Sequence, residues 1–387
     1  MNIQEALKAT PADIERSYKL RLAIIDEIRE SKDGLMSFGD FAQRSMYGYD
    51  ADLPGYYTNT NFSPNNPDGD SSDTFGTAAV YPGVGAAIGE IAVIELAGMI
   101  GTNPLTLIEV GGGDGIMMRN MIVGSGKQLQ REGLSRTIHP IMIDRTPQLL
   151  DRQASAIQEV RVSDNTLRVA DPLLVGSRLE DAEMPSQAVG AVISNELLDM
   201  LPFEVACDIE ESVPGMFYVK VVNGKIVPAF APARSEYMDD AAYTLEKNPH
   251  KPLQSFQPTL IESVKQLADL IEQGVIITTD YKAGCEPDVQ VMRNGVSGVP
   301  LMELQFPGLF DISVVPDWAK IRKWAIAAYG KENVEFESLG SFILSSETHD
   351  DLSKIFPKNR QKKDARELLR QLATMAMGNY DTLLIRK

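Results

Sequence analysis

The chain has 387 residues, 43% of them apolar, and a formal net charge of -17. This length suits one or two domains with a large buried core. So negative a charge argues against nucleic acid as a partner, because phosphate backbones are bound by clustered Lys and Arg. An acidic surface mildly favours cationic or neutral substrates.

Membrane and metal partners are not expected either. No run reaches the roughly 20 apolar residues of a membrane span, and the start, MNIQEALKATPADIERS, has no export or transit pattern. The cysteines are Cys207 and Cys285, and His139, His250 and His349 are scattered rather than spaced as metal ligands. We therefore expect a cytoplasmic protein with no membrane partner, no metal and no disulfide framework.

Residues 1–100 precede the strongest strand and helix patterns and predict a cap of helices and loops. Within them, Ser63–Asp73 (SPNNPDGDSSD) is rich in turn-forming residues. This segment predicts either an active-site cover or a plain surface loop.

A glycine-rich turn follows the predicted strand Leu105–Val110 in the stretch LTLIEVGGGDG. Such turns bring the backbone close to a ligand and allow positive φ. A P-loop needs Lys and Ser/Thr after its last glycine, and a dinucleotide fingerprint needs a glycine at position 116, where the chain has Ile116. Asp114 also repels a phosphate at the start of the next helix. The turn therefore predicts a cradle for a cofactor without phosphate, the alternative being an ordinary turn with no ligand.

Read as E-x-G-x-G-x-G, residues 109–115 resemble the first motif of class I S-adenosylmethionine (SAM) methyltransferases. SAM carries a sulfonium, an ammonium and a ribose, so carboxylates near it are attractive. The resemblance implies SAM as cofactor and S-adenosylhomocysteine as product, with a cofactor site that includes Glu109, Gly111, Gly112, Gly113 and Gly115.

Strands and helices alternate after this turn. The predicted elements are a helix over Asp114–Leu129 that Gly124 and Gly126 end early, a strand over Ile138–Asp144, a helix starting at Thr146-Pro147, a strand over Ala188–Ser194, a helix over Thr259–Gln273 stopped by Gly274, a strand over Gly274–Tyr281 and a last strand over Asp381–Arg386. This alternation predicts an α/β fold, a mainly parallel sheet with helices on both faces, whose ligands bind at the carboxyl ends of the strands.

The segment Phe203–Pro258 interrupts this order. Within it, FYVKVVNGKIVPAF predicts a β-hairpin turning at Asn223-Gly224. We expect this insert to shape the side of the site that receives the acceptor. The predicted segments are the cap 1–100, a first core part 101–202, the insert 203–258 and the remaining core 259–387.

Polar residues follow two further strands. Asp144 ends the second strand, where its carboxylate accepts two ribose hydroxyls or serves as a charge at the next helix start, and its neighbour Arg145 belongs to the same predicted site. Asp171, in VADPLL, is predicted either to lie near the adenine amine or to form a turn before Pro172.

The cluster SNELLDMLPFE, Ser194–Glu204, places an amide and two carboxylates directly after an apolar strand. Buried polar groups are costly unless they are paired or used. Glu196 is the predicted catalytic carboxylate, which accepts a hydrogen bond or a proton from an acceptor N–H. Asn195 is predicted to contact cofactor and acceptor, and Asp199 either orients a partner of Glu196 or belongs to the first turn of a helix.

Together these motifs resemble the MidA-like SAM methyltransferase family, which includes a mitochondrial arginine methyltransferase of complex I assembly. The resemblance rests on motifs in order along most of the chain: Ser37–Phe41 with Met46-Tyr47 and Gly55-Tyr56-Tyr57, the glycine turn, Asp144 with Gln148, Leu149 and Gln153, NELLDMLP at 195–202, Thr279-Asp280-Tyr281, and Phe306–Ser313 followed by Val315–Trp318. It implies a class I methyltransferase fold, a protein arginine as acceptor, and a substrate side that includes Tyr56, Tyr57, Asp280 and Tyr281.

Two function classes stay open from the sequence. The first is a methyltransferase acting on nitrogen or oxygen, with a protein arginine or a small molecule as acceptor. The second is a non-catalytic assembly factor on the same fold. The glycine turn with Asn195 and Glu196 favours the enzyme, because a scaffold has no physical need for that combination. Whether the chain forms a homodimer is likewise left open.

Overall fold

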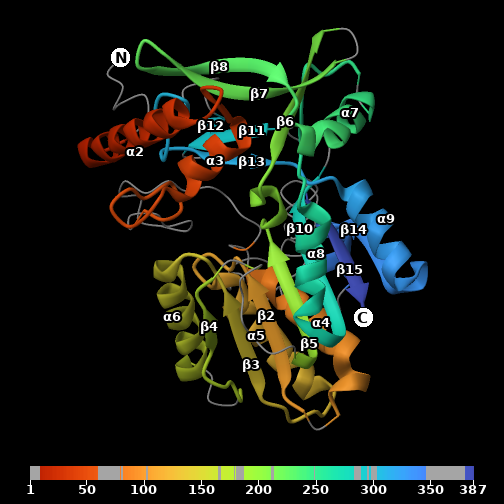
Figure 1. Cartoon of the computed structure of the whole chain (residues 1–387). Coiled ribbons are helices and arrows are strands. Elements are labelled where there is room, and N and C mark those ends of the chain that lie inside the picture. Colours follow the sequence, from red (N-terminus) through yellow and green to blue (C-terminus); the bar gives the residue numbers. More distant parts are fainter. Residues whose placement is uncertain are drawn as a thin grey trace, which may run out of the picture. The chain divides into compact units, whose positions relative to one another are not determined.

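The computed structural model (Figure 1) describes residues 9–59, 79, 82–101, 103–163, 167–177, 179, 187–210, 213–247, 249–282, 289–293, 296–297, 303–345 and 380–387. Ser63–Asp73, the predicted cover or loop, and Cys285 lie outside these residues. The chain groups into two compact units, one of 1–76, 199–260 and 286–317, the other of 77–198, 261–285 and 318–387. The segment boundaries expected from the sequence stay predictions of functional segments, which need not coincide with these units.

The second unit is the α/β core. Its helices and strands are α4 (Pro82–Ile100), β2 (Leu105–Val110), α5 (Ile116–Arg131), β3 (Ile138–Ile143), α6 (Pro147–Ser163), β4 (Leu173–Val175), β5 (Gln187–Asn195), α8 (Leu260–Asp269), β10 (Ile271–Tyr281), α9 (Trp318–Tyr329), β14 (Val334–Ser338), α10 (Leu339–Ser345) and β15 (Tyr380–Arg386). A short 3-10 helix lies at Lys331–Asn333, and another, Leu198–Met200, lies where the sequence passes from the second unit to the first.

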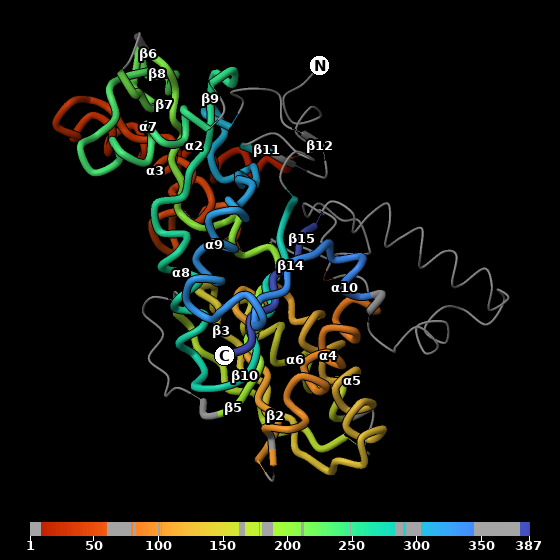
Figure 2. Tube along the Cα trace, turned by 90° about the vertical axis from the view of Figure 1, so that its right-hand side faces the viewer, coloured from red at the N-terminus to blue at the C-terminus, as the bar shows by residue number. Residues whose placement is uncertain are grey.

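A seven-stranded sheet in the order β14-β15-β10-β5-β2-β3-β4 forms this core. The pairs from β10 to β4 are parallel, and β15 is antiparallel to both β10 and β14. All six residues of β2 are buried, as expected for a central strand covered on both faces. Figure 2 views the sheet edge-on, with α4, α5 and α6 on one side of the strands and α8 and α9 on the other. The predicted mainly parallel sheet with helices on both faces is confirmed.

The first unit is built on a smaller antiparallel sheet. Its elements are α2 (Pro11–Glu30), β1 (Leu35–Ser37), α3 (Phe38–Tyr47), β6 (Glu204–Glu210), β7 (Val213–Val222), β8 (Lys225–Pro232), a 3-10 turn at Ser235–Tyr237, α7 (Met238–Lys247), β9 (Leu253–Phe256), β11 (Val289–Arg293), β12 (Val296–Ser297) and β13 (Asp311–Val314). One sheet has the order β1-β7-β6-β9 with β8 on β7, and the other has the order β12-β11-β13.

Alternation along β7 explains how its sheet is covered on both faces. Phe217 and Val219 join the apolar cluster of α2, α3 and β13, whereas Met216 and Tyr218 join that of α7. This is the two-residue period of a strand. The predicted hairpin is confirmed, because β7 and β8 pair antiparallel around Asn223 and Gly224, both with positive φ as a two-residue turn requires.

Two predictions about glycines were wrong. Helix α5 runs to Arg131 through Gly124, which was expected to end it with Gly126. A side chain on Gly124 would lie 2.0 Å from the carbonyl oxygen of Ala86, and one on Gly89 would lie 2.2 Å from that of Met121. These glycines therefore let α4 and α5 pack with their backbones close together rather than stopping a helix.

Gly274 is likewise not a helix stop. Helix α8 ends at Asp269, and Gly274 lies inside β10 with φ 140°. A Cβ on Gly274 would lie 1.9 Å from the carbonyl oxygen of Gly190 on the neighbouring β5. Close approach of two strands explains this glycine.

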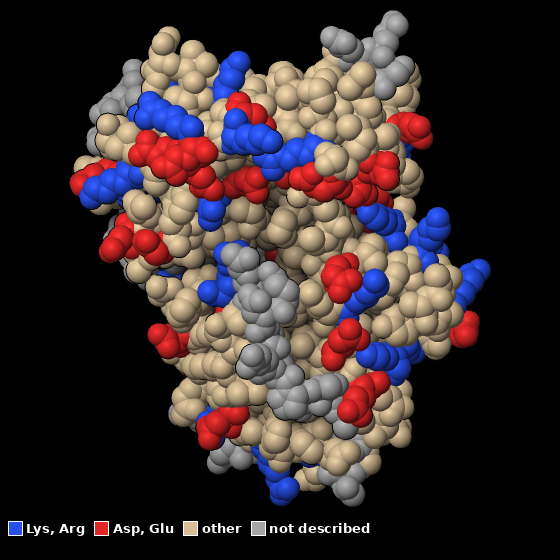
Figure 3. All heavy atoms as spheres, in the orientation of Figure 1, with Lys and Arg blue, Asp and Glu red and all other residues tan. Residues whose placement is uncertain are grey.

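Charged side chains of both signs lie next to one another on the face drawn in Figure 3. Arg44 donates to both oxygens of Glu27 at 3.0 Å, and Lys247 lies 2.8 Å from Asp317. In the described residues, several Lys and Arg side chains are thus paired with carboxylates. Within the described residues, no helix combines the length and the apolar composition that a membrane span needs.

Replacement of Gly274 by alanine is expected to destabilise the core. The new methyl group overlaps the Gly190 carbonyl, so the free energy of unfolding should fall by about 2 kcal/mol or more. Gly98→Ala is the matched control, because Gly98 is exposed in α4 with no atom within 4 Å of its Cβ position. It should be neutral or stabilising by about 0.5–1 kcal/mol. Urea unfolding checks both, and a Gly274→Ala protein as stable as the native one would contradict the packing argument.

Candidate functional site

The candidate site lies at the carboxyl edge of the seven-stranded sheet. Chain order reverses between β2 and β5, since β3 and β4 follow on one side of β2 and β5 and β10 lie on the other. In open α/β sheets ligands bind at such a switch point. The segments that leave the strands here are Gly111–Gly115, Asp144–Thr146 and Asn195–Leu198.

The glycine turn has a backbone that other residues rarely adopt. Gly111, Gly113 and Gly115 have φ values of 71°, 56° and 81°. A Cβ on Gly115 would lie 2.7 Å from the Cα of Gln153 on α6, and one on Gly111 would lie 3.0 Å from the Leu197 side chain. The turn is therefore packed closely between α6 and the segment after β5.

Glu109 lies beneath this turn. Its side chain is 2% exposed, its Oε2 atom has no hydrogen-bond partner, and a Cβ on Gly112 would lie 2.8 Å from that atom. Burial, then the charges of Asp114 and Asp144, raise the pKa of Glu109 well above its ordinary value, against a hydrogen bond from the Met118 backbone. Repulsion among these three carboxyl groups would be reduced by a cation bound next to them.

Asp144 is held from two sides. It is 7% exposed, and its oxygens accept hydrogen bonds from the backbone N–H of Thr146 at 2.9 Å and from Nε2 of Gln153 at 3.0 Å. Burial raises the pKa of Asp144 to about 6, although these hydrogen bonds and the charge of Arg145 lower it. The predicted helix start is confirmed as well, since α6 begins at Pro147.

Asp171 is not brought to this edge. It precedes β4, whose Leu173 pairs with Ile141 of the parallel β3, so it lies towards the amino ends of the strands. Its exposed carboxylate forms an ion pair with Arg161 of α6. This position favours the turn over the adenine contact, the two roles that the sequence left open.

Asn195 and Glu196 end β5 in a strained turn. Glu196 has φ 50°, and in the described part of the chain only Asn223 shares a positive φ among residues other than glycine. Asn195 Nδ2 donates to Glu196 Oε1 at 3.3 Å, and the Tyr281 hydroxyl lies 3.5 Å from Glu196 Oε2. Backbone strain of this kind is concentrated at functional sites. The amide, the carboxylate and the phenol thus lie together, and their roles toward ligands stay predictions.

Asp280 holds this turn from the neighbouring strand. It is fully buried, and its two oxygens accept from the backbone N–H groups of Leu198 and Tyr281, each at 2.8 Å. The adjoining Tyr281 stacks on Tyr380 with ring centroids 5.0 Å apart. Asp280 was predicted on the substrate side; its observed contacts are those of a group that fixes the end of β5.

Three further predicted residues belong to the first unit. Tyr57 donates to Asp311 Oδ1 at 2.8 Å, and Tyr56 packs edge-to-face on it with centroids 5.0 Å apart. Burial first, then the charge of Asp311 and more weakly that of Asp199, raise the pKa of Tyr57 well above its ordinary value. Asp199 is 3% exposed within the 3-10 helix Leu198–Met200. Tyr56, Asp199 and Asp311 are buried and Tyr57 is partly buried, so phenols and carboxylates lie close together in this unit.

Sequence reasoning missed two contacts of the site. Gln153 bonds both the glycine turn and Asp144, and Leu197 covers Gly111. Gln153 appeared only as a letter of a family motif, and Leu197 as an apolar residue between two acids. Helical spacing puts Gln153 on the same face as apolar Leu150 and Ile157, both buried, which was the available signal.

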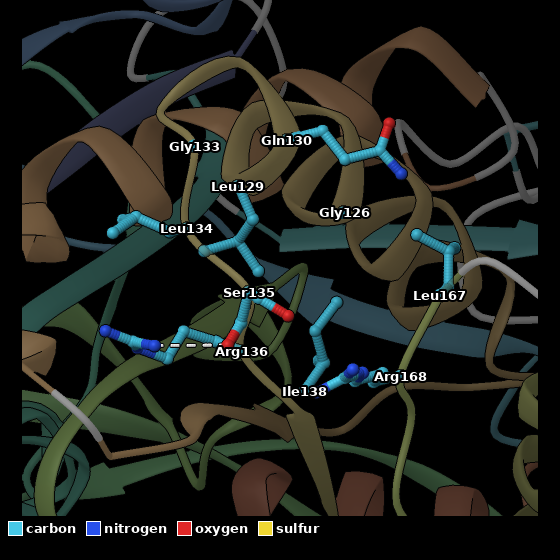
Figure 4. A pocket seen from close by; sticks show the side chains of 10 residues that line it. All are labelled: Gly126, Leu129, Gln130, Gly133, Leu134, Ser135, Arg136, Ile138, Leu167 and Arg168. Carbon is cyan, nitrogen blue, oxygen red and sulfur yellow. Dashed lines mark hydrogen bonds between the residues drawn. The ribbon is translucent and has the colours of Figure 1, made fainter.

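A surface hollow of about 240 Å³ lies elsewhere in the core, at the amino ends of the strands. Figure 4 shows Leu129 of α5 and Ile138 of β3 pointing toward its middle, with Leu167 and Arg168 on one side. Because β3 begins at Ile138, this hollow is at the opposite edge from the glycine turn. It is not part of the candidate site.

Comparisons with known proteins give a family and solved structures with a similar fold. The family model described as "Putative S-adenosyl-L-methionine-dependent methyltransferase" matches residues 87–336. A Burkholderia thailandensis protein bound to S-adenosyl-homocysteine superposes with a TM-score of 0.76 at 20% identity, covering 98% of this chain and 94% of that one. A second Burkholderia thailandensis structure, described as a member of the same superfamily as the first, gives a TM-score of 0.72 at 18% identity. It covers 98% of this chain and 94% of that one. None of the curated protein sequences matches this chain. The predicted class I methyltransferase fold is confirmed.

Replacement of Asp280 by asparagine is expected to loosen the turn after β5. Asparagine keeps one acceptor oxygen but turns an NH₂ toward the other backbone N–H, so the free energy of unfolding should fall by about 1–3 kcal/mol. Asp269→Asn is the control, because Asp269 is 79% exposed and its ion pair with Lys387 is 3.6 Å long; it should cost less than about 1 kcal/mol. Equal urea midpoints for the native and Asp280→Asn proteins would show that Asp280 does not stabilise the turn after β5.

Proposed function

Since this chain belongs to the family of S-adenosyl-L-methionine-dependent methyltransferases, we propose that it methylates a nitrogen acceptor, a protein arginine side chain, at the carboxyl edge of its seven-stranded sheet. The reaction class and the cofactor SAM follow from the family and agree with the sequence prediction. The observation that carries the proposal is the glycine turn over the buried carboxyl group of Glu109, directly beside Asn195 and Glu196.

The residues present fit SAM. When bound, SAM supplies a methyl group activated by a sulfonium cation. The backbone of Gly111–Gly113 receives the methionine part closely because no side chain stands on it. Asp114 and Asp144 act on the buried carboxyl of Glu109 and raise its pKa, and a bound sulfonium or ammonium cation would favour the ionised form of that carboxyl. An oxygen of Glu109 without a partner supports the same assignment.

Asp144 and Arg145 hold the sugar in this proposal. The two bonds from Thr146 and Gln153 fix the carboxylate of Asp144, and a carboxylate retains further lone pairs for two hydroxyls. Arg145 follows directly and lowers the pKa of Asp144 through its charge. Asp171 is not assigned a cofactor contact, because of its ion pair with Arg161.

Glu196 is the proposed proton acceptor. Methyl transfer is an in-line displacement, in which the C–S bond breaks as the N–C bond forms, so the protein chiefly aligns the nitrogen and excludes water. An arginine nitrogen also loses a proton, and the carboxylate of Glu196 takes it up. Asn195 and Tyr281 hold that carboxylate by bonds of 3.3 Å and 3.5 Å. The strained backbone of Glu196 aims the group instead of letting the side chain lie along the strand.

The arginine assignment rests on the MidA-like resemblance and on the chemistry of these groups. A guanidinium needs a carboxylate close to it, and Glu196 offers one. Tyr56 and Tyr57 on the substrate side, and Asp199 in the catalytic group, stay predictions from the sequence. A small-molecule amine or hydroxyl is the alternative acceptor. A cytoplasmic location and a homodimer are kept as proposals from the sequence.

The acceptor is tested by incubating the purified protein with isotope-labelled SAM and a cell lysate. A parallel sample uses the same lysate after its own proteins have been removed. Label in acid-precipitable protein, released as methylarginine on hydrolysis, is the expected result. Label confined to small molecules would replace the protein acceptor by the alternative while leaving the methyltransferase assignment intact. Catalysis by the Glu196→Gln protein serves as the background for both.

Gly113→Val is expected to abolish SAM binding. Gly113 has φ 56°, a conformation that a β-branched residue adopts only with strain, and its new side chain would occupy the surface of the turn. Titration calorimetry with SAM and S-adenosylhomocysteine measures the loss. Gly133→Val, with φ 66° in the loop after α5, is the control with comparable strain away from the site; it should bind like the native protein. Native binding by Gly113→Val would remove the glycine turn from the site.

Glu196→Gln is expected to slow the reaction rather than to weaken the binding of SAM. The change keeps size and removes the proton acceptor, so turnover should fall by roughly 100-fold or more, while the Kd for SAM stays within about threefold because the turn and Asp144 are untouched. Steady-state kinetics and calorimetry check the two parts, and Asp199→Asn should have the smaller effect. Turnover at the native rate would make Glu196 structural and favour an oxygen acceptor aligned by proximity alone.

A further inference from the structure

One buried side chain joins two parts of the proposed cofactor site that come from different strand ends. Gln153 of α6 is fully buried. Its Nε2 donates to the carbonyl oxygen of Gly113 at 2.9 Å and to Oδ2 of Asp144 at 3.0 Å. Both protons of one amide nitrogen are therefore used, one on the glycine turn after β2 and one on the acid after β3.

Packing fixes the place of this amide. A Cβ on Gly115 would lie 2.7 Å from the Cα of Gln153, so the turn and the first half of α6 are in backbone contact. Gln153 lies on the buried face of α6 with Leu150 and Ile157. The amide is thus buried beside the turn, and the turn has little room to shift toward the helix.

We infer that Gln153 is a positioning residue of the cofactor site: its amide ties the glycine turn to Asp144 and keeps that carboxylate oriented and ionised for the ribose. This inference rests on the proposed function, in which Asp144 holds the sugar. It assigns Gln153 no contact with SAM.

Electrostatics gives the amide a second effect besides orientation. Asp144 is nearly buried, and burial raises its pKa to about 6. Hydrogen bonds from Thr146 and Gln153 and the charge of Arg145 oppose that rise. The charges of Asp114 and Asp144 in turn raise the pKa of the neighbouring Glu109. Without the Gln153 donor, the ionised form of Asp144 loses one of the hydrogen bonds that lower its pKa, so its pKa rises further.

The sign of the pH effect follows from this. Ribose hydroxyls are donors, so they bind the ionised carboxylate best. Affinity for SAM is then full above the pKa of Asp144 and falls as pH drops through it. Gln153→Met, which keeps the length and removes the donor, moves this fall to higher pH. The defect of the variant should therefore shrink as the pH rises.

The experiment compares SAM binding by native protein, Gln153→Met and the control Gln158→Met by calorimetry between about pH 6.5 and about pH 9. Gln158 is exposed on the same helix, so its variant should bind natively at every pH. The Kd of Gln153→Met should rise by about tenfold or more at pH near 7, the usual scale for losing a hydrogen bond to a charged group, and approach the native Kd as the pH rises. In the Asp144→Asn background the same change should give a ratio that does not vary with pH.

Three results would overturn the inference: a native Kd and pH profile for Gln153→Met, a loss of the same size at every pH, or an unchanged pH profile of the defect when Asp144 is Asn. Should Gln153→Met fail to fold, Gln153→Glu keeps the length and places a like charge beside Asp144, and native binding by it above pH about 7.5 overturns the inference equally. Failure of the proposed function is distinguishable, because then Gly113→Val and Asp144→Asn themselves bind SAM as the native protein does.

Discussion

A carboxyl group buried at the switch point of the sheet is the constraint on which the site depends. Glu109 ends the central strand, is 2% exposed, and has one oxygen without a partner beneath a turn made of glycine. Leaving such a group unpaired costs free energy that an apolar residue would not. The cost is understandable where a cationic cofactor lies above the turn, because its charge then offsets the crowding of Glu109 with Asp114 and Asp144.

Close backbone approach supplies the frame around that carboxyl. Gly124 and Gly89 let α4 and α5 come together behind the sheet, Gly274 lets β10 approach β5, and Gly115 sets the turn against α6. None of these contacts leaves space for a methyl group. The positions of the helices and strands around the turn, and of the turn against α6, are therefore fixed by packing. Asp280 completes the frame by fixing the segment after β5, which carries Glu196 in its strained conformation. Precision at the site thus depends on backbone packing and on the hydrogen bonds of Asp280.

How far the sequence could predict this structure depended on how local the cause was. The strand before the glycine turn, the helix start at Pro147 and the hairpin at Asn223-Gly224 follow from neighbouring residues, and all three are confirmed. Gly124 and Gly274 were misread as helix ends because the backbone they accommodate belongs to elements distant in sequence, carrying Ala86 and Gly190. The same reason hid Gln153, whose two bonds span 40 and 9 residues. Roles of Glu196, Asp144 and Tyr57 toward ligands stay predictions, since a local pattern names the groups but not what they hold.

A crystal structure of the protein with S-adenosylhomocysteine tests the central claim most directly. The account predicts the methionine part against the backbone of Gly111–Gly113 and both ribose hydroxyls within about 3.2 Å of the Asp144 carboxylate. Gln153 should keep its bonds to Gly113 and Asp144. Ligand density in the hollow lined by Leu129 and Arg168, or a ribose beyond hydrogen-bond distance of Asp144, would contradict it.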